Sequence, residues 1–452
     1  MQSLQSFMET LSGWVWGPYM LFLIVGTGVF LTVRLLFWQF RMLPLAFKQV
    51  FGKHPEHSGQ GDISQFAALM TALSATIGTG NIAGVATACV LGGPGAVFWM
   101  WMTALFGMAT KYGEGVLAVK YRVQNEKGEM SGGPMYYIER GLGAKWKWLA
   151  ILFALFGTLA SFGIGSSVQS NTVALAVESS LGIETWMTGV VITIFSALVI
   201  LGGIQSISKA SSWIVPIMAI GYVLGGLIII LNNLHLVIPA LKMIFTFAFT
   251  GEAAVGGAIG AAIRYGVARG VFSNEAGMGS APIAAAAAKT DHPVRQGLVS
   301  MTGTFLDTII VCSITGIVLV MGFIMAGQSF GDQTGAVLTI RIFDQLLPGF
   351  GGWVVTFGVI FFAYSTILGW CYYGEKCCTY LLGEKWVLLY RLIYIASVFV
   401  GCVVSLDLVW LFADTFNGLM AVPNLIALLL LSGLIAKESQ DFIDRRKSGE
   451  LY

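Results

Sequence analysis

The chain has 452 residues, of which 56% are hydrophobic and 11% are charged, and its net charge is only +2. Its mean hydropathy of +0.79 lies far outside the range of soluble domains, and no basic tail or patch indicates nucleic acid as a partner. The composition predicts an integral membrane protein, and the absence of alternating apolar and polar residues favours helices over a barrel of strands.

The apolar runs predict an all-α protein with eleven transmembrane helices, because a helix needs roughly 20 apolar residues to cross a bilayer. In chain order the predicted segments are residues 14–37, 63–92, 94–118, 147–178, 184–205, 210–231, 253–289, 296–326, 350–383, 386–405 and 407–435. No Lys or Arg precedes the first apolar run, so we expect a retained helix there rather than a signal peptide. The six cysteines form no CxxC pair and are expected to be packing residues.

Basic residues indicate the orientation, because cytoplasmic loops of membrane proteins are enriched in Lys and Arg. The residues assigned to the cytoplasmic side are Arg34, Arg41, Lys48, Lys53, Lys111, Lys120, Arg122, Lys127, Arg140, Lys145, Lys147, Lys209, Lys289, Arg295, Lys376, Lys385, Lys437, Arg445, Arg446 and Lys447. The loops at 178–185 and 327–337 are poor in Lys and Arg. We therefore expect a multi-pass protein of the cell membrane, with its N-terminus outside and its C-terminus in the cytoplasm.

The second segment contains an unusual stretch, TIGTGNIAGVATA at 76–88. Gly78, Gly80, Gly84 and Asn81 stand where leucines would make a better helix, because glycine and short polar residues weaken helices. Gly80 and Gly84 also form a GxxxG pair, a motif that packs membrane helices closely without any ligand. The stretch indicates either an unwound segment within the membrane or a packing seam.

The seventh segment contains a comparable stretch, GVFSNEAGMGSAPIAAAAA at 270–288, in which Asn274 follows Asn81 by 193 positions. Each stretch begins a set of five segments, 63–231 and 253–435, so the second set enters the membrane from the opposite side. We therefore predict an N-terminal helix and loop at 1–62, inverted repeats at 63–232 and 233–436, and a cytoplasmic tail at 437–452.

Breaks at matched places of two inverted halves are typical of secondary transporters, whose substrate binds where the half-helices meet. The N-termini of half-helices suit an anion, while their C-terminal carbonyls suit a cation. A zwitterionic amino acid accompanied by a sodium ion fits both requirements.

Four pieces of the chain resemble the alanine or glycine:cation symporter family, the sodium:alanine symporters of bacteria and archaea. They are GDISQFAALMTALSATIGTGNIAGVATACVLGGPGAVFWMW, GEMSGGPMYYIERGLG, GVFSNEAGMGSAPIAAAAAKTDHPVRQGLVSM and GWCYYGEKC. The resemblance covers nearly the whole chain. It implies a LeuT-like fold of the APC superfamily, sodium-coupled uptake of alanine and glycine, and no covalent chemistry or organic cofactor.

The resemblance also implies a substrate site shared by the two breaks. The backbone of the first break is expected to bind the substrate carboxylate, and oxygens of the second break the ammonium. The residues expected there are Thr76, Gly78, Thr79, Gly80, Asn81, Phe272, Ser273, Asn274 and Gly277. Asn274 has a competing interpretation as a structural residue that holds the break open.

Two side chains from other segments are expected to reach the same cavity. Gln169 is a polar residue deep in the fourth segment, although an interhelical hydrogen bond without ligand contact explains it equally simply. Trp370 in the ninth segment is expected to close the pocket over a small side chain, with packing or lipid contact as the alternative.

The LeuT-like fold implies a sodium site between the ninth segment and the first break. Its expected ligands are the hydroxyls of Ser365 and Thr366 and the carbonyls of Ser74 and Ile77, since hard oxygen ligands suit such an ion. The competing interpretation is that the hydroxyls bond only to the preceding turn of their own helix.

Ionisable residues inside spans are functional candidates, and Asp307, Arg264, Arg269 and Glu275 lie in or beside the second set. Asp307 is a candidate to attract a cation, whereas Arg269 and Glu275 either pair or line a vestibule. A channel is disfavoured because the two breaks are unlike, and no enzyme motif is present. Proton-coupled uptake of a related small amino acid remains the alternative, and a complete repeat in one chain makes a monomer sufficient.

Overall fold

The computed structural model describes residues 2–52, 59–250, 259–327, 329–330, 333–404 and 407–451. Most of these residues lie in helices, and the sheet within these ranges is a hairpin of β1 (Val123–Gln124) and β2 (Met130–Ser131). Seven helical stretches of the described chain are long and apolar enough to cross a membrane, namely Gln5–Arg34, Ala144–Leu181, Gly203–Asn232, Pro293–Met325, Gly351–Leu382, Glu384–Val403 and Leu411–Leu430. The protein is therefore a multi-pass membrane protein.

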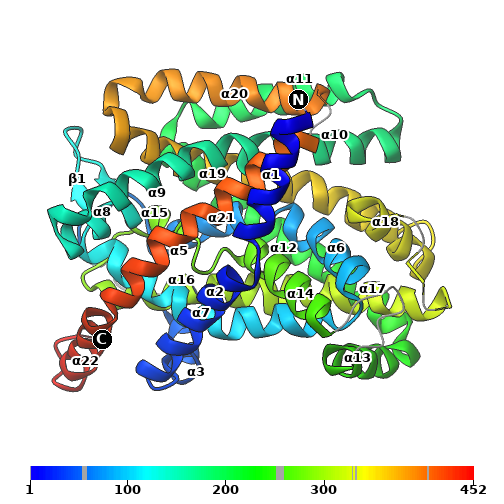
Figure 1. Ribbon diagram of the computed structural model, residues 1–452, viewed down its shortest axis with the longest axis horizontal. Coiled ribbons are helices and arrows are strands. Elements are labelled where there is room, and N and C mark those ends of the chain that lie inside the picture. Colours follow the sequence, from blue (N-terminus) through cyan, green and yellow to red (C-terminus); the bar gives the residue numbers. More distant parts are fainter. Residues whose placement is uncertain are drawn as a thin grey trace.

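The helices of the first half are α1 (Gln2–Val15), α2 (Pro18–Arg34), α3 (Trp38–Arg41), α4 (Leu43–Phe51), α5 (Gln65–Thr76), η1 (Thr79–Asn81), α6 (Ala83–Gly92), α7 (Ala96–Lys120), α8 (Pro134–Tyr137), η2 (Ile138–Leu142), η3 (Ala144–Trp146), α9 (Lys147–Ala160), η4 (Ser161–Ser167), α10 (Val168–Leu181), α11 (Thr185–Ile200), α12 (Gly203–Asn232) and α13 (Leu234–Phe249). Those of the second half are α14 (Ile259–Asn274), α15 (Ala281–Ala285), α16 (Pro293–Thr304), η5 (Phe305–Cys312), α17 (Ser313–Met325), α18 (Gly335–Leu346), α19 (Gly351–Leu382), η6 (Glu384–Trp386), α20 (Val387–Val403), α21 (Asp407–Leu430) and α22 (Ser432–Lys447). Figure 1 shows their arrangement.

Both predicted helix interruptions are confirmed. Helix α5 ends at Thr76, Gly78 is extended with φ −137° and ψ −152°, and α6 begins only after the single turn η1. Beyond α14, Glu275, Gly277 and Gly279 have φ angles of 53°, 90° and 83° before α15 begins. Glycine adopts positive φ without steric cost, whereas Glu275 is held there by its surroundings.

The helix boundaries differ from the prediction in several places. Helix α12 begins at Gly203 rather than 210, and the predicted segment 407–435 is divided between α21 and α22. Helices α13 and α18 were not predicted. Helix α13 has 16 residues, which at about 1.5 Å per residue is too short for the roughly 30 Å hydrocarbon layer. Leu234–Phe249 is apolar, but it is shorter than the roughly 20 residues that a span requires.

Glycines allow the central helices to approach closely. Helix α7 packs against both α16 and α14. A Cβ added at Gly115 would lie 2.7 Å from Ser300 Oγ, so only glycine fits that contact. A Cβ at Gly80 would lie 3.2 Å from both Phe272 Cδ1 and Ser273 Cα. The two interruptions therefore touch each other inside the bundle.

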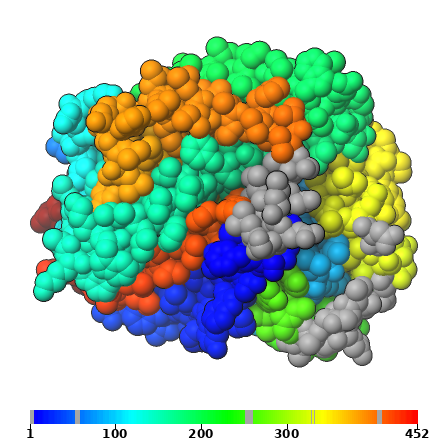
Figure 2. Space-filling model, turned by 45° about the horizontal axis from the view of Figure 1, so that its top comes forward, coloured from blue at the N-terminus to red at the C-terminus, as the bar shows by residue number. Residues whose placement is uncertain are grey.

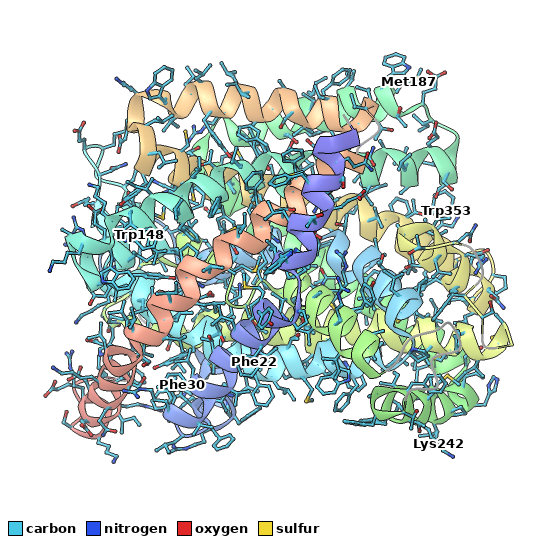
Figure 3. All side chains as sticks on the ribbon, viewed as in Figure 1. Phe22, Phe30, Trp148, Met187, Lys242 and Trp353 are labelled. Atoms are coloured by element: carbon cyan, nitrogen blue, oxygen red, sulfur yellow. The ribbon has the colours of Figure 1, made fainter. Side chains whose placement is uncertain are left out.

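The outer surface carries large apolar side chains. Phe22, Phe30, Trp148, Met187 and Trp353, labelled in Figure 3, project outward from the helices and are exposed. Helices α11 (green) and α20 (orange) pack together and cover one side of the molecule in Figure 2. Such an extended apolar surface indicates contact with lipid.

A clamp ties the beginning of α5 to the end of α15. Ile63 and Ala288 form a parallel bridge. Arg122 donates hydrogen bonds to the carbonyls of Ala286 (3.0 Å), Ala288 (2.6 Å) and Gln60 (2.6 Å). These five residues, the Arg122 clamp, hold the outer ends of two half-helices that come from different halves of the chain.

Candidate functional site

Asn81 organises the first break. Its Oδ1 accepts a hydrogen bond from Gly78 N (2.9 Å), and its Nδ2 donates to Asp307 Oδ1 (2.6 Å). The amide offers both a donor and an acceptor, so one side chain connects the unwound backbone to η5. The Gly78 N–H, which was predicted to face a carboxylate, is held here by the Asn81 amide oxygen.

Asp307 joins the two breaks. Besides the bond from Asn81, its Oδ2 accepts from Ser273 Oγ (3.0 Å) and Thr308 Oγ1 (2.7 Å). Asp307 is fully buried, and within the described residues no Lys, Arg or His nitrogen lies within 4.0 Å of its carboxylate. A buried carboxylate is costly inside a membrane, so Asp307 stays a candidate functional residue, as the sequence analysis expected.

The predicted residues of the second break lie at the same junction. Phe272 and Ser273 contact Gly80, as described above. Asn274 Nδ2 donates to Thr308 Oγ1 (3.1 Å), while its Oδ1 accepts from Ala276 N (3.0 Å). These bonds agree with the alternative interpretation of Asn274 as a residue that shapes the break.

Gln169 and Trp370 reach the two breaks from neighbouring helices. Gln169 Oε1 accepts a long hydrogen bond from Thr79 N (3.4 Å), and its Nε2 donates to Ile164 O (3.0 Å). Trp370 is 1% exposed, which excludes contact with lipid, and its Nε1 donates to Glu275 Oε1 (3.0 Å). Each of these side chains therefore adjoins one break.

Three of the four predicted sodium ligands, Ser74, Ser365 and Thr366, lie where α5 meets α19. Ser365 Oγ lies 3.3 Å from Ser74 O, and a Cβ at Gly78 would lie 2.5 Å from Thr366 Oγ1. Both hydroxyls also donate to Phe362 O at 2.9 Å, as the competing interpretation expected. A hydroxyl that donates its proton retains lone pairs, so these oxygens remain able to ligate a cation. No group of three His, Cys, Asp or Glu side chains suited to a metal occurs in the described part of the chain.

Of the two remaining predicted substrate residues, Gly277 lies away from this junction, whereas Thr76 adjoins it by sharing a small cavity with Asn274. Gly277 N donates to Glu114 Oε1 (3.1 Å), and a Cβ at Gly277 would lie 3.0 Å from Leu425 Cδ2, so Gly277 faces α7 and α21. Thr76 Oγ1 is closest to carbonyls of its own helix, at 3.3 Å from Ala72 O. Thr76 also lines a cavity of about 10 Å³, enough for roughly one water.

Glu114 is a buried charged residue beside the second break that the sequence analysis missed. Its Oε1 accepts from Gly277 N (3.1 Å), Gly279 N (3.2 Å) and Asn424 Nδ2 (2.6 Å). Asn424 in turn donates to Gly277 O (2.9 Å) and accepts from the Tyr137 hydroxyl. A glutamate inside an apolar segment was itself the available signal.

The charged residues require two corrections. Lys111, assigned from sequence to a cytoplasmic loop, is 3% exposed inside α7 and therefore contributes nothing to the loop charge. Arg269 and Glu275 do not pair: the Arg269 guanidinium lies 5.5 Å from the Phe272 ring centroid, and the Glu275 carboxylate accepts from Trp370 and Ser280. Because they do not pair, the alternative prediction, that Arg269 lines a vestibule, is the one that stays.

The chain is similar to known proteins over nearly its whole length. The chain matches the sodium:alanine symporter family over residues 1–451. It is 59% identical over 445 residues to the sodium/alanine symporter AgcS of Methanococcus maripaludis, with 98% of each chain covered. It is 39% identical over 458 residues to the putative sodium/proton-dependent alanine carrier protein YrbD of Bacillus subtilis, with 98% of this chain and 93% of the relative covered.

The fold resembles that of solved LeuT-like transporters. The structure of MhsT in complex with L-phenylalanine matches with a TM-score of 0.57 over 83% of this chain and 98% of that chain. At 12% sequence identity this likeness concerns the fold alone.

Proposed function

Since the chain belongs to the sodium:alanine symporter family, we propose that it carries out sodium-coupled uptake of alanine and glycine by alternating access. The observation that carries this proposal is the contact between the two breaks, where Asn81 and Ser273 both donate to Asp307. Broken helices that meet inside a membrane supply backbone donors and acceptors without a separate ligand-binding loop.

The substrate carboxylate binds at the first break in this proposal. The Gly78 and Thr79 N–H groups lie just before α6 and now donate to the amide oxygens of Asn81 and Gln169. These two amide oxygens accept the hydrogen bonds that a substrate carboxylate would accept from the unwound backbone N–H groups. Binding then exchanges amide acceptors for a charged one, which forms stronger hydrogen bonds.

The substrate ammonium binds toward the C-terminal end of α14, near Phe272, Ser273 and Asn274. Carbonyls at the end of a helix carry partial negative charge, and Asp307 adds a full one nearby. Gly80 is in contact with Phe272, and Trp370 is buried beside Glu275, so large side chains surround the junction. A small substrate such as alanine or glycine is favoured by this crowding.

Sodium binds between Ser74, Ile77, Ser365 and Thr366 in the same proposal. Support comes from the approach of Ser365 Oγ to Ser74 O and from the tight contact between Gly78 and Thr366. Because Gly78 belongs to the substrate site and Thr366 to the ion site, occupation of one site changes the geometry of the other. This shared contact provides a physical route for coupling.

The proposed topology has eleven spans in a five-plus-five inverted repeat behind one extra helix, with the N-terminus outside and the C-terminus cytoplasmic. Repeats at 63–232 and 233–436 are supported by α8 and α18, which both lie between the second and third spans of their set. A monomer in the cell membrane is sufficient, since both breaks belong to one chain.

The test of coupling is uptake of labelled alanine into proteoliposomes under an imposed sodium gradient, compared with a proton gradient at equal sodium on both sides. We expect labelled alanine to accumulate when the sodium gradient is imposed. Proton coupling is the second candidate, because Asp307 is buried among neutral donors and the relative YrbD is named a sodium/proton-dependent carrier. Uptake that follows protons and ignores sodium would replace the first candidate by the second.

Two substitutions separate the substrate site from the ion site. Asn274→Ala is expected to weaken alanine binding at saturating sodium, whereas Thr366→Ala is expected mainly to raise the sodium concentration required. Thr87→Ala is the matched control, because the Thr87 hydroxyl bonds only to its own helix at Ala83 O (2.9 Å). If both variants behave like this control, the site assignment is wrong.

A further inference from the structure

A polar cavity lies between α1, α14 and α21. It has a volume of about 240 Å³, and its charged or polar lining includes Glu9 and Ser12 of α1, Arg264 and Arg269 of α14, and Asp414 of α21. Cavities for drug-sized ligands measure roughly 300–1,000 Å³, so this one suits a smaller molecule. Figure 1 shows α1 lying along α21, where the cavity forms.

The four charged side chains of this cavity make no direct ion pair with one another, although Arg269 lies near enough to Asp414 to stabilise its negative charge. Among the described residues, Glu9, Asp414, Arg264 and Arg269 form no ion pair within 4.0 Å. The arginines instead lie over aromatic rings of their own helix, Arg264 over Tyr265 and Arg269 over Phe272. Two positive and two negative groups therefore surround one space while remaining separate.

The other charged cavity provides a contrast. It has a volume of about 180 Å³ and is lined by Glu375, Arg391, Glu129 and Lys376. There Arg391 bonds Glu375 through two nitrogens (2.6 and 3.0 Å), and Lys376 lies 3.6 Å from Glu129. Its charges are joined in ion pairs, whereas those of the cavity beside α1 are not, and Glu9 there accepts a hydrogen bond from Gln5 Nε2 (3.1 Å).

The first cavity is connected to the junction of the breaks through α14. Arg269 lies over the Phe272 ring, and Phe272 contacts Gly80 of the first break. From residue 264 to residue 272 the helix advances about 12 Å, at about 1.5 Å per residue. The cavity therefore extends from Arg264, roughly two helical turns from Phe272, to Arg269, which lies over the Phe272 ring of the proposed substrate site.

We propose that this cavity is a second binding site for a zwitterionic amino acid, distinct from the site at the two breaks. Arg264 and Arg269 bind the carboxylate, because a guanidinium matches its planar pair of oxygens. Glu9 and Asp414 bind the ammonium. The identity of the ligand rests on the proposed transport of small amino acids.

The proposal also gives the N-terminal helix a role. Helix α1 lies outside the two repeats, yet it supplies Glu9 and Ser12 to the cavity wall. It is fixed to α21 by a hydrogen bond from Trp16 Nε1 to Asp414 O (3.1 Å). The acidic groups of two elements thus face the basic groups of a third, which is the arrangement that a zwitterion requires.

The test uses a thiol placed in this cavity. All six native cysteines are buried, so a Ser12→Cys variant of the full chain carries one accessible thiol. We expect alanine to slow its reaction with a charged methanethiosulfonate at least threefold in sodium-free buffer. Propionate and ethylamine, which each retain only one of the two charges, should protect less.

Adding Glu9→Gln and Arg264→Gln should abolish protection, whereas the exposed Lys242→Gln on α13, labelled in Figure 3, should preserve it. Alanine binding at saturating sodium confirms that each variant is folded. Protection that needs sodium, or that survives the double substitution, would overturn the second site. If alanine protects the Ser12→Cys thiol without sodium, but the protein shows no sodium-driven alanine uptake, the second site is supported and the proposed function is refuted.

Discussion

Gly78→Ala tests whether the substrate and sodium sites share a contact. A Cβ at this position would lie 2.5 Å from Thr366 Oγ1 and 3.5 Å from Gln169 Oε1. The extended φ of −137° suits alanine, so the effect arises from crowding rather than from backbone strain. Thr366 must move or rotate, which displaces a proposed sodium ligand.

The expected magnitude follows from the cost of overpacking. Forcing an extra methyl group into a packed interior costs about 1–3 kcal/mol. If this cost falls on the sodium-bound state, the sodium concentration for half-maximal uptake rises about 5- to 150-fold. Gly84→Ala is the control in the same segment, because its Cβ would meet only Thr79 O at 4.0 Å.

The assay is the sodium dependence of labelled alanine uptake in proteoliposomes, with thermal unfolding of each variant measured in parallel. We expect Gly78→Ala to require more sodium while Gly84→Ala remains close to the original protein. Equal sodium dependence of the two variants, both folded, would refute a shared contact between Gly78 and the ion site.

Three further substitutions address other parts of the structure. Gly80→Ala places a Cβ 3.2 Å from Ser273 Cα and should reduce alanine uptake at least tenfold in a folded protein, whereas unchanged uptake would show that the breaks need not touch. Glu114→Gln removes the charge from an acceptor of three hydrogen bonds and should lower the free energy of unfolding by about 1–3 kcal/mol in denaturation measurements, with an unchanged midpoint as the contrary result. Arg122→Gln should accelerate hydrogen exchange at Lys289 N, which bonds Ile63 O (2.7 Å), and unaltered exchange would mean that the bridge holds without the guanidinium.

The interruptions of both helices were predictable because their cause is local. Glycine and short polar side chains weaken a helix wherever they stand, and the matched places of the stretches around Asn81 and Asn274 favoured unwinding over close packing. The connection between Asn81 and Asp307 was not, since it joins positions 226 residues apart. Predicting it requires knowing how η5 packs against the first break.

Glu114 shows a different limit of sequence reasoning. Glu114 stands near the end of an apolar segment with Lys111 close by, and although its charge was a visible signal, its hydrogen-bond partners lie 163 to 310 positions away. The same pattern led to the assignment of Lys111 to a loop. Length and hydropathy therefore identify membrane segments well, whereas the depth of a charged residue near a segment end depends on tertiary packing.

The three hydrogen bonds that Glu114 Oε1 accepts connect separate parts of the fold. One oxygen atom fastens α7, α21 and the backbone just before α15, so these parts cannot separate without exposing a buried charge. The Arg122 clamp adds the start of α5 to the same assembly. If the hydrogen bonds of Glu114 and Arg122 persist through the proposed transport cycle, these helices move as one rigid body. The backbone then bends mainly at Gly78 and at the end of α14. A transporter built this way would place its hinges at the ligand itself.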